Sequence, residues 1–452
     1  MLIHGVPCSF RLPHSWQQPL LLRWRRSPRL PSAPRLVFST VRCFISSSDD
    51  KPKVIVLSGP TGAGKSRLAL ELAKRLNGEV ISADSVQVYQ GLDVGSAKPS
   101  RSDRQEVPHH LVDIMHPCED YSVGHFYEDA RRATKDIISR GRVPIVSGGT
   151  GLYLRWYVYG KPNVPKASPE ISSEVSAELE RFQRIGDWSS AVQFVVKAGD
   201  PRAQSLATND WYRLRRSLEI IKSTGSPPSA FRIPYNSFKE NYHSTAEIGG
   251  PESRTSTVVE EFSTKQLDYN FICFFLSSPR LDLYRCIDLR CEDMLLGQDS
   301  LLSEAQWLLE QGFLPNSNSA TRAIGYRQAM EYLLWCREQG GRSSPADFFS
   351  FLSEFQKASR NFAKRQLTWF RNEPLYYWLN ASNPMEKVLN VIHDAYHDQT
   401  GDFEVPQSLK IDKEMTNRRE TLALKSYQAK NRHFVDRGDC SDILEWIKRI
   451  QK

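Results

Sequence analysis

The chain has 452 residues, 40% of them hydrophobic and 25% charged, a balance that excludes a disordered chain, a fibrous protein and a small disulfide scaffold. Its apolar runs are far shorter than the ~18–20 residues of a membrane-spanning helix, so we expect no membrane partner. The net charge of +8 supports a nucleic-acid partner only weakly, because five of these charges lie in the first 50 residues.

Residues 1–50 have the composition of a transit peptide. They contain seven arginines and no acidic residue before Asp49, and they are rich in serine, proline and leucine. The apolar run at 20–22 is too short for the core of a secretory signal. We therefore predict an organellar protein, in a mitochondrion or a plastid. The alternative is a disordered N-terminal tail that stays attached.

Short apolar runs alternate with helix-like segments over residues 51–164. The apolar spacing predicts strands and helices in turn. The strands are expected at 54–57, 80–82, 110–114 and 143–147, and the helices at 66–76 and 126–139. This alternation is typical of an α/β domain, so we expect a parallel sheet flanked by helices, with residues 51–164 as the first part of its core.

The pattern then becomes helical. Residues 165–224 are interpreted as an inserted all-helical subdomain, with helices at 174–185 and 211–222, and residues 225–267 as a flexible loop rich in serine, proline and glycine. Residues 268–380 are expected to return to the core, with a strand at 271–276 and helices at 282–296, 301–311, 322–339 and 345–371. Residues 381–452 are expected to be a polar C-terminal extension with one or two helices and no assigned role.

The segment between the first strand and the first helix is a phosphate-binding loop (P-loop) that matches G-x-x-x-x-G-K-[ST]. Its residues are Gly59, Pro60, Thr61, Gly62, Ala63, Gly64, Lys65 and Ser66. The glycines let backbone N–H groups point at phosphate oxygens, Lys65 adds a positive charge, and the Ser66 hydroxyl can bind Mg²⁺. The pattern predicts a ligand that carries a diphosphate.

The second half of a conventional NTPase site is poorly supported. Enzymes that hydrolyse ATP or GTP hold Mg²⁺ with a further carboxylate at the end of a later strand. Asp113 is a possible candidate, but the strand at 143–147 continues into Gly148, Gly149 and Thr150 without a carboxylate.

Further motifs follow in a fixed order. They are Ile81-Ser82-Ala83-Asp84-Ser85-Val86-Gln87-Val88-Tyr89 and the segments at 91–99, 148–153, 210–219, 322–328 and 364–371. With the P-loop, these motifs resemble the tRNA dimethylallyltransferase (isopentenyltransferase, IPP transferase) family over about residues 53–379. The chain looks most like a bacterial-type member in a plant organelle, because it lacks the C-terminal Cys₂His₂ finger of eukaryotic cytosolic members.

The resemblance implies a P-loop NTPase-like fold and a Mg²⁺-dependent prenyltransferase. The implied reaction moves a dimethylallyl group from dimethylallyl diphosphate to N6 of adenosine 37 in tRNAs with adenosines at 36 and 37. This modification would also contribute to the supply of cis-zeatin-type cytokinins. Because the diphosphate leaves intact, the missing carboxylate is no longer a difficulty. The expected partners are the tRNA anticodon stem-loop and dimethylallyl diphosphate, and the expected state is a monomer.

The resemblance also assigns roles to residues. Asp84 would be the base that removes the N6 proton, and Thr150 would line the transfer channel. As alternatives, Asp84 caps a helix or binds Mg²⁺, and Thr150 simply caps a helix. Ser66 would hold Mg²⁺. The expected tRNA contacts are Ser85, Val86, Gln87, Arg213, Arg215, Arg216, Arg322, Tyr326, Arg327, Lys364 and Arg371.

The helix predicted at 345–371 has a basic face that suits phosphate binding. This face comprises Lys357, Arg360, Lys364, Thr368 and Arg371, whereas Phe355, Phe362 and Trp369 lie on another face. Three other functions stay open: a P-loop small-molecule kinase, an adenylate isopentenyltransferase that acts on free AMP, and an RNA-binding protein with a degenerate P-loop. The arginines of the helical insertion argue against the second, and intact Lys65, Ser66 and Asp84 argue against the third.

Overall fold

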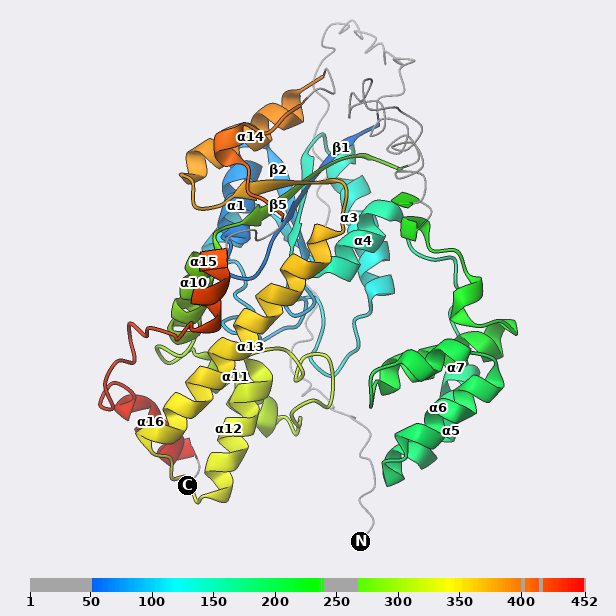
Figure 1. Ribbon diagram of the computed structural model, residues 1–452, viewed down its shortest axis with the longest axis vertical. Helices are drawn as coiled ribbons and strands as arrows, with labels where there is room; N and C mark the ends of the chain where they lie inside the picture. Colours follow the sequence, from blue (N-terminus) through cyan, green and yellow to red (C-terminus); the bar gives the residue numbers. More distant parts are fainter. Residues whose placement is uncertain (1–50, 237, 240–266, 400–402, 414–417, 451–452) are drawn as a thin grey trace, which may run out of the picture. The chain divides into compact units, whose positions relative to one another are not determined.

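The computed structural model describes residues 51–236, 238–239, 267–399, 403–413 and 418–450 (Figure 1). All of them belong to one compact unit of the chain, Asp50–Lys452. The predicted leader and residues 240–266 of the predicted loop lie outside this description. Within it, no helix has both the length and the apolar character needed to cross a bilayer.

A parallel sheet of six strands forms the centre of this unit, in the order β3-β2-β4-β1-β5-β6. The strands are β1 (Lys53–Ser58), β2 (Gly78–Ala83), β3 (His109–His110), β4 (Val143–Gly148), β5 (Asn270–Ser277) and β6 (Tyr376–Asn380). All residues of β2 and β4 are buried, as expected for strands covered on both faces. The α/β class predicted from the sequence is confirmed.

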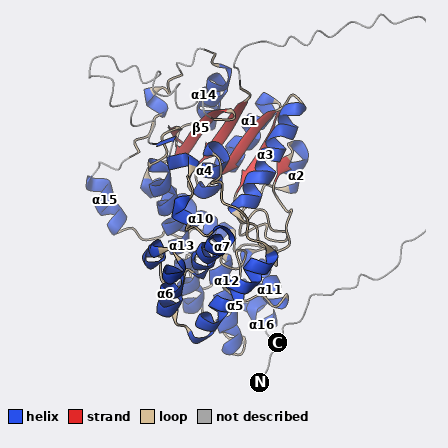
Figure 2. Ribbon diagram, turned by 90° about the vertical axis from the view of Figure 1, so that its right-hand side faces the viewer, coloured by secondary structure: helices blue, strands red, loops and turns tan. Residues whose placement is uncertain are grey.

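Helices cover both faces of the sheet, as Figure 2 shows with the strands in red. One face, with Ile55 and Leu57 of β1, packs against α1 (Lys65–Leu76) and α14 (Met385–His397). The other face, with Val54 and Val56, packs against α3 (Val123–Ser139) and α4 (Gly151–Tyr159). Successive side chains of a strand point to opposite faces, which is why one apolar run supplies both layers.

The helical insertion has a small core of its own. It contains α5 (Pro169–Ile185), α6 (Trp188–Ala198), a 3₁₀ helix at Pro201–Ser205 and α7 (Trp211–Thr224). The three α-helices begin at Ser168, Asp187 and Asp210, whose side chains each accept a backbone hydrogen bond and so stabilise the helix start. Apolar residues from all three, such as Leu179, Val195 and Leu214, form the core.

A second set of helices follows β5. These are α10 (Arg280–Asp293), α11 (Leu301–Glu310), α12 (Tyr326–Glu338) and α13 (Pro345–Arg371). Elsewhere, a short helix, α2 (Arg101–Glu106), precedes β3. The start of α13 was predictable, because Ser344 and Asp347 form a capping box around Pro345. Helix α12 begins four residues later than predicted, after Gly325, whose φ of +94° is not helical.

Other parts of the chain also differ from the sequence prediction, among them helices α4 and α6, which were not predicted. The run at 110–114 contributes only β3, because Leu111 and Asp113 have positive φ values of 63° and 58°, which end the strand. Strand β6 was not predicted. The C-terminal extension was predicted to be polar with one or two helices, but in its described part it contains α14, α15 (Arg418–Lys425) and α16 (Ser441–Ile450), and α14 packs on the sheet.

Candidate active site

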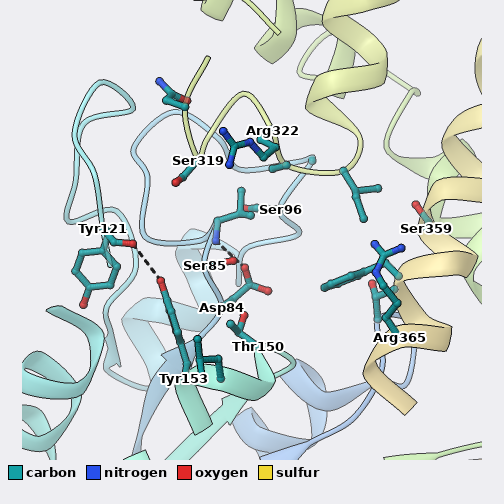
Figure 3. Close-up of a pocket in the computed structure, with 18 of the residues that line it drawn as sticks. Asp84, Ser85, Ser96, Tyr121, Thr150, Tyr153, Ser319, Arg322, Ser359 and Arg365 are labelled. Carbon is teal, nitrogen blue, oxygen red and sulfur yellow. Dashed lines mark hydrogen bonds between the residues drawn. The ribbon is translucent and has the colours of Figure 1, made fainter. Parts of the chain in front are cut away.

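A cavity of about 780 Å³ lies at the carboxyl ends of the central strands (Figure 3). Thr61 follows β1, Asp84 follows β2 and Thr150 follows β4, and all three line the cavity. The carboxyl ends of parallel strands meet at one edge of a sheet, which is where α/β proteins bind ligands. Helices α10 and α13 supply further lining residues, among them Arg290 and Phe355.

The P-loop connects β1 to α1 and leaves backbone donors available. Gly62 and Gly64 both have φ of +82°, a conformation that favours glycine. Helix α1 begins at Lys65 without a side-chain cap, so its first N–H groups can bind an anion. At Gly59, a Cβ atom would lie 2.5 Å from the carbonyl oxygen of Leu276, so this position requires glycine. The geometry is that of a phosphate cradle.

Two cations meet at the P-loop. The Lys65 ammonium donates to the Pro60 carbonyl oxygen at 2.8 Å, and Nη1 of Arg290, from α10, donates to the Thr61 hydroxyl at 2.7 Å. Burial and, to a smaller extent, the Arg290 charge lower the pKa of Lys65, the Asp84 charge raises it, and the net result is a pKa of about 8. Burial also lowers the pKa of Arg290. Within the described part of the chain neither cation forms an ion pair, so the pair favours a multiply charged anion such as a diphosphate.

The pKa of Lys65 allows a prediction of how diphosphate binding depends on pH. With a pKa of about 8 in the free protein, its side chain is mostly charged at pH 7 and mostly neutral at pH 9. A bound diphosphate favours the charged form, so binding at high pH requires uptake of a proton. We expect the Kd of inorganic diphosphate, measured by calorimetry, to rise about tenfold from pH 7 to pH 9. The variant Lys65→Gln should bind weakly at every pH, and an equally flat profile in the unmodified protein would contradict the prediction.

Asp84 is held by the backbone through one oxygen only. Its Oδ1 accepts hydrogen bonds from the N–H groups of Val86 at 2.8 Å and Gln87 at 3.4 Å. Its Oδ2 has no hydrogen-bond partner among the residues that the structure describes, and the side chain lines the cavity (Figure 3). Residues 85–88 form a turn and not a helix, so Asp84 does not cap a helix. The turn uses one carboxylate oxygen and leaves the other available to a ligand.

Thr150 precedes α4 and lies close to Asp84 (Figure 3). Its backbone N–H approaches the Ala83 carbonyl oxygen at 3.4 Å, which joins the ends of β4 and β2. Its hydroxyl makes no capping hydrogen bond to α4. The helix-cap alternative is therefore wrong for this side chain, and the hydroxyl is available in the cavity.

Gln366 connects the two loops of the site, and the sequence reasoning did not single it out. Its Oε1 accepts a hydrogen bond from the Thr61 N–H at 2.9 Å, and its Nε2 donates to the Gly149 carbonyl oxygen at 3.0 Å. A Cβ atom at Gly149 would lie 2.2 Å from that Nε2. The Gly-Gly-Thr motif thus leaves room for a side chain of α13, and Gln366 sets the distance between the P-loop and Thr150.

Two of the predicted tRNA contacts, Gln87 and Tyr326, are buried in the protein without RNA. The Gln87 amide is buried: its Oε1 accepts from the Ser82 hydroxyl, and its Nε2 donates to the carbonyl oxygens of Ser96 and Ala97. Tyr326 is fully buried, and its hydroxyl donates to Glu304 at 2.7 Å. Both side chains serve the fold, because their polar groups are used inside the protein.

Glu304 explains why Tyr326 is buried. Its carboxylate also accepts hydrogen bonds from the backbone N–H groups of Asp93, Val94 and Gly95, at 2.6, 2.7 and 3.0 Å. Gly95 and its neighbour Ser96 line the cavity. Tyr326 and Glu304 therefore hold in place the loop that closes this side of the site.

The other predicted tRNA contacts divide by exposure. Ser85, Val86, Arg215 and Arg322 line the cavity. Arg213 and Lys364 are exposed, Arg327 is half-buried, Arg216 pairs with Glu219, and Nε of Arg371 donates to the Lys413 carbonyl oxygen. Their contacts with RNA stay predictions, because the structure contains the protein without RNA.

Helix α13 presents only part of the basic face that its spacing indicated, since Lys357, Lys364 and Thr368 are exposed. Arg360 forms an ion pair with buried Asp288 and is not free for RNA. Phe355, Phe362 and Arg365 line the cavity, so residues outside the predicted basic face also contribute to the site. Figure 3 shows Arg365 at the cavity. An ion pair with a residue distant in the sequence, Asp288, makes Arg360 of α13 unavailable to a ligand.

Asp113, the candidate for the second carboxylate of an NTPase, is not available to the site. Asp113 forms ion pairs with Lys98 and Arg104 and does not line the cavity. The Asp113 carboxylate is therefore neutralised by two cations outside the cavity.

Known proteins match both the sequence and the structure. Residues 87–373 match the family model described as IPP transferase, and residues 52–112 match the one described as isopentenyl transferase. The chain is 61% identical over 429 residues to tRNA dimethylallyltransferase 9 of Arabidopsis thaliana, covering 93% of this chain and 92% of that protein. It is 37% identical over 349 residues to the tRNA dimethylallyltransferase of Protochlamydia amoebophila, covering 77% and 90%. A crystal structure of a eukaryotic dimethylallyltransferase acting on tRNA aligns with a TM-score of 0.56 at 25% identity, covering 76% of this chain and 79% of that one.

Proposed function

The chain belongs to the IPP transferase family, and we propose that it transfers a dimethylallyl group from dimethylallyl diphosphate to N6 of adenosine 37 in tRNA. One arrangement carries the proposal: the P-loop holds two cations, Lys65 and Arg290, that have no ion-pair partner among the described residues, and it lies beside the Asp84 carboxylate, whose Oδ2 has no hydrogen-bond partner among them. Thr61, Arg290 and Asp84 line the same cavity. The cations suit a diphosphate and the carboxylate suits an amine proton.

At the donor end, the bond between C1 of the prenyl group and the diphosphate oxygen breaks, and negative charge builds on the departing diphosphate. The N–H groups at the start of α1, the Lys65 ammonium and the Arg290 guanidinium stabilise that charge. They do so without moving, since Gln366 and Thr61 fix the loop beforehand.

At the acceptor end, N6 of the adenine forms the new bond to C1. Oδ2 of Asp84 accepts the N6 proton, and the Thr150 hydroxyl lies close enough to the carboxylate to orient either reacting group. A base in an anticodon loop can leave its stack for a few kcal/mol, and aromatic side chains can hold it. The cavity offers Tyr153, Trp211, Tyr212, Phe355 and Phe362.

Mg²⁺ fits this site only as an ion that arrives with the diphosphate. Among the residues described, no group of three His, Cys, Asp or Glu side chains could hold a metal ion. The exposed Ser66 hydroxyl and Oδ2 of Asp84 would supply oxygen ligands, and Mg²⁺ commonly combines a few such ligands with substrate phosphates. When bound, the ion would neutralise charge on the leaving diphosphate.

A polynucleotide acceptor suits the rim better than free AMP. Arg215 and Tyr212, from the helical insertion, and Arg322, from the loop before α12, all line the cavity. Their charges lie beyond the reaction centre, where an anticodon stem-loop would offer phosphates. A small-molecule kinase is disfavoured because Asp113 is paired elsewhere and β4 ends without a carboxylate.

The direct test incubates protein lacking residues 1–50 with Mg²⁺, dimethylallyl diphosphate and an unmodified tRNA that has adenosines at 36 and 37. We expect N6-dimethylallyladenosine in the digested RNA by mass spectrometry, none when residue 37 is guanosine, and no prenylated AMP. Prenylated AMP without prenylated tRNA would support the adenylate enzyme. ATP consumption without prenyl transfer would support the kinase.

A further inference from the structure

Part of the C-terminal extension packs along helix α10, the helix that carries Arg290. Figure 1 shows α15 beside α10. We call the described residues 418–434 the strap. The strap meets α10 at its start, where the Glu420 carboxylate accepts a hydrogen bond from the Arg280 N–H at 3.0 Å, and again at its end, where it reaches Glu292.

Glu292 depends on the strap for its hydrogen bonds. Its side chain is fully buried, and its carboxylate accepts from the backbone N–H groups of Arg432, His433 and Phe434 at 2.9, 2.7 and 3.1 Å. A buried carboxylate is costly unless donors satisfy it, and three N–H groups do so here. The ring of Phe434, itself buried, packs on Phe348 and fixes this turn of the strap.

Asp288, one helical turn earlier, depends on the strap in part. It is buried, pairs with Arg360 of α13, and accepts a hydrogen bond from the Tyr427 hydroxyl at 2.8 Å. The Tyr427 ring also packs edge-on against Tyr284 of α10, with ring centres 5.4 Å apart. The strap therefore contacts α10 at the start, middle and end of the helix.

The opposite side of α10 forms a wall of the cavity. Ile287, Arg290 and Met294 line it, and Asp288 and Glu292 lie two residues before and after Arg290. A helix turns 100° per residue, so the two carboxylates and the guanidinium point to different sides of one turn. In one and the same rotation of α10 about its axis, Asp288 and Glu292 accept their hydrogen bonds from the strap and Arg290 donates to the Thr61 hydroxyl.

We propose that the strap is a positioning element of the donor site: by binding Asp288 and Glu292, it holds α10 so that Arg290 meets the diphosphate at the P-loop. This rests on the proposed function, because it takes the ligand of Arg290 to be the donor diphosphate. It gives the C-terminal extension a role that the polar composition of that segment does not indicate.

Two substitutions in the full chain test the proposal without removing the strap. Glu292→Gln leaves one neutral oxygen to accept hydrogen bonds from three N–H donors. Tyr427→Phe removes the hydroxyl that donates a hydrogen bond to Asp288. We expect the KM for dimethylallyl diphosphate to rise about fivefold in the first and less in the second, with the KM for tRNA unchanged. Glu354→Gln is the control, because Glu354 is an exposed carboxylate on α13 that pairs only with Lys357 in the described structure.

A double-mutant cycle separates positioning from a general loss of stability. In an Arg290→Gln background, Glu292→Gln should cause no further rise in the Kd of dimethylallyl diphosphate, measured by calorimetry without tRNA. Effects that multiply, or a lower melting temperature with an unchanged KM, would overturn the proposal. If the unmodified protein prenylates no tRNA, the proposed function fails, whereas the calorimetric cycle still reports on the strap.

Discussion

Asp84→Asn is expected to reduce dimethylallyl transfer by about 10²–10⁴-fold while tRNA binding stays the same, because it removes a base and keeps the shape of the side chain. The asparagine oxygen can still accept the hydrogen bonds from Val86 and Gln87, so the turn after β2 should persist. The measurement is the single-turnover rate of N6-dimethylallyladenosine formation, with the Kd of tRNA determined by filter binding.

The matched control is Asp136→Asn, an exposed aspartate of α3 outside the cavity. It should leave the rate and the tRNA affinity unchanged. A near-normal rate for Asp84→Asn would refute the assignment of the base. Recovery of that variant by high Mg²⁺ concentrations would instead make Asp84 a metal ligand, the alternative that the free Oδ2 also allows.

Arg290→Gln is expected to lower kcat/KM for dimethylallyl diphosphate by about 10²–10³-fold, the usual effect of removing a preorganised donor from a site of developing charge. The glutamine can still donate to the Thr61 hydroxyl, so the loop should keep its conformation. Because the cation it removes is half-buried without an ion-pair partner among the described residues, the melting temperature should be equal or higher.

Loss of activity together with retained stability would identify Arg290 as a binding group and not a structural one. Arg285→Gln serves as the control, since Arg285 is an exposed residue of the same helix that pairs with Asp282. An Arg290→Gln protein with unchanged affinity for dimethylallyl diphosphate would contradict the role in donor binding, and a lower melting temperature would contradict the expected strain of the unpaired charge.

The sequence alone predicted the parts of the site that depend on neighbouring residues. The P-loop is a continuous motif whose glycines, helix start and Lys65 act within eight residues. Asp84 and Thr150 follow short apolar runs, and parallel strands bring the ends of such runs together. The start of α13 at Pro345 followed from a local capping box. The organellar leader stays a prediction, because residues 1–50 lie outside the described structure.

Only the tertiary structure decided which polar groups are free. Arg290 and Gln366 reach Thr61 from 229 and 305 residues away. No local pattern marks Arg290, and the motif at 364–371 contains Gln366 without indicating its partner. Tyr326 and Gln87 belong to motifs of the family, yet burial directs them to Glu304 and to the loop at 96–97. Spacing shows which residues share a helix face, whereas partners from distant elements determine whether that face is open. Arg360, paired with Asp288, illustrates the difference: a charge is available to a ligand only when the fold has not already neutralised it.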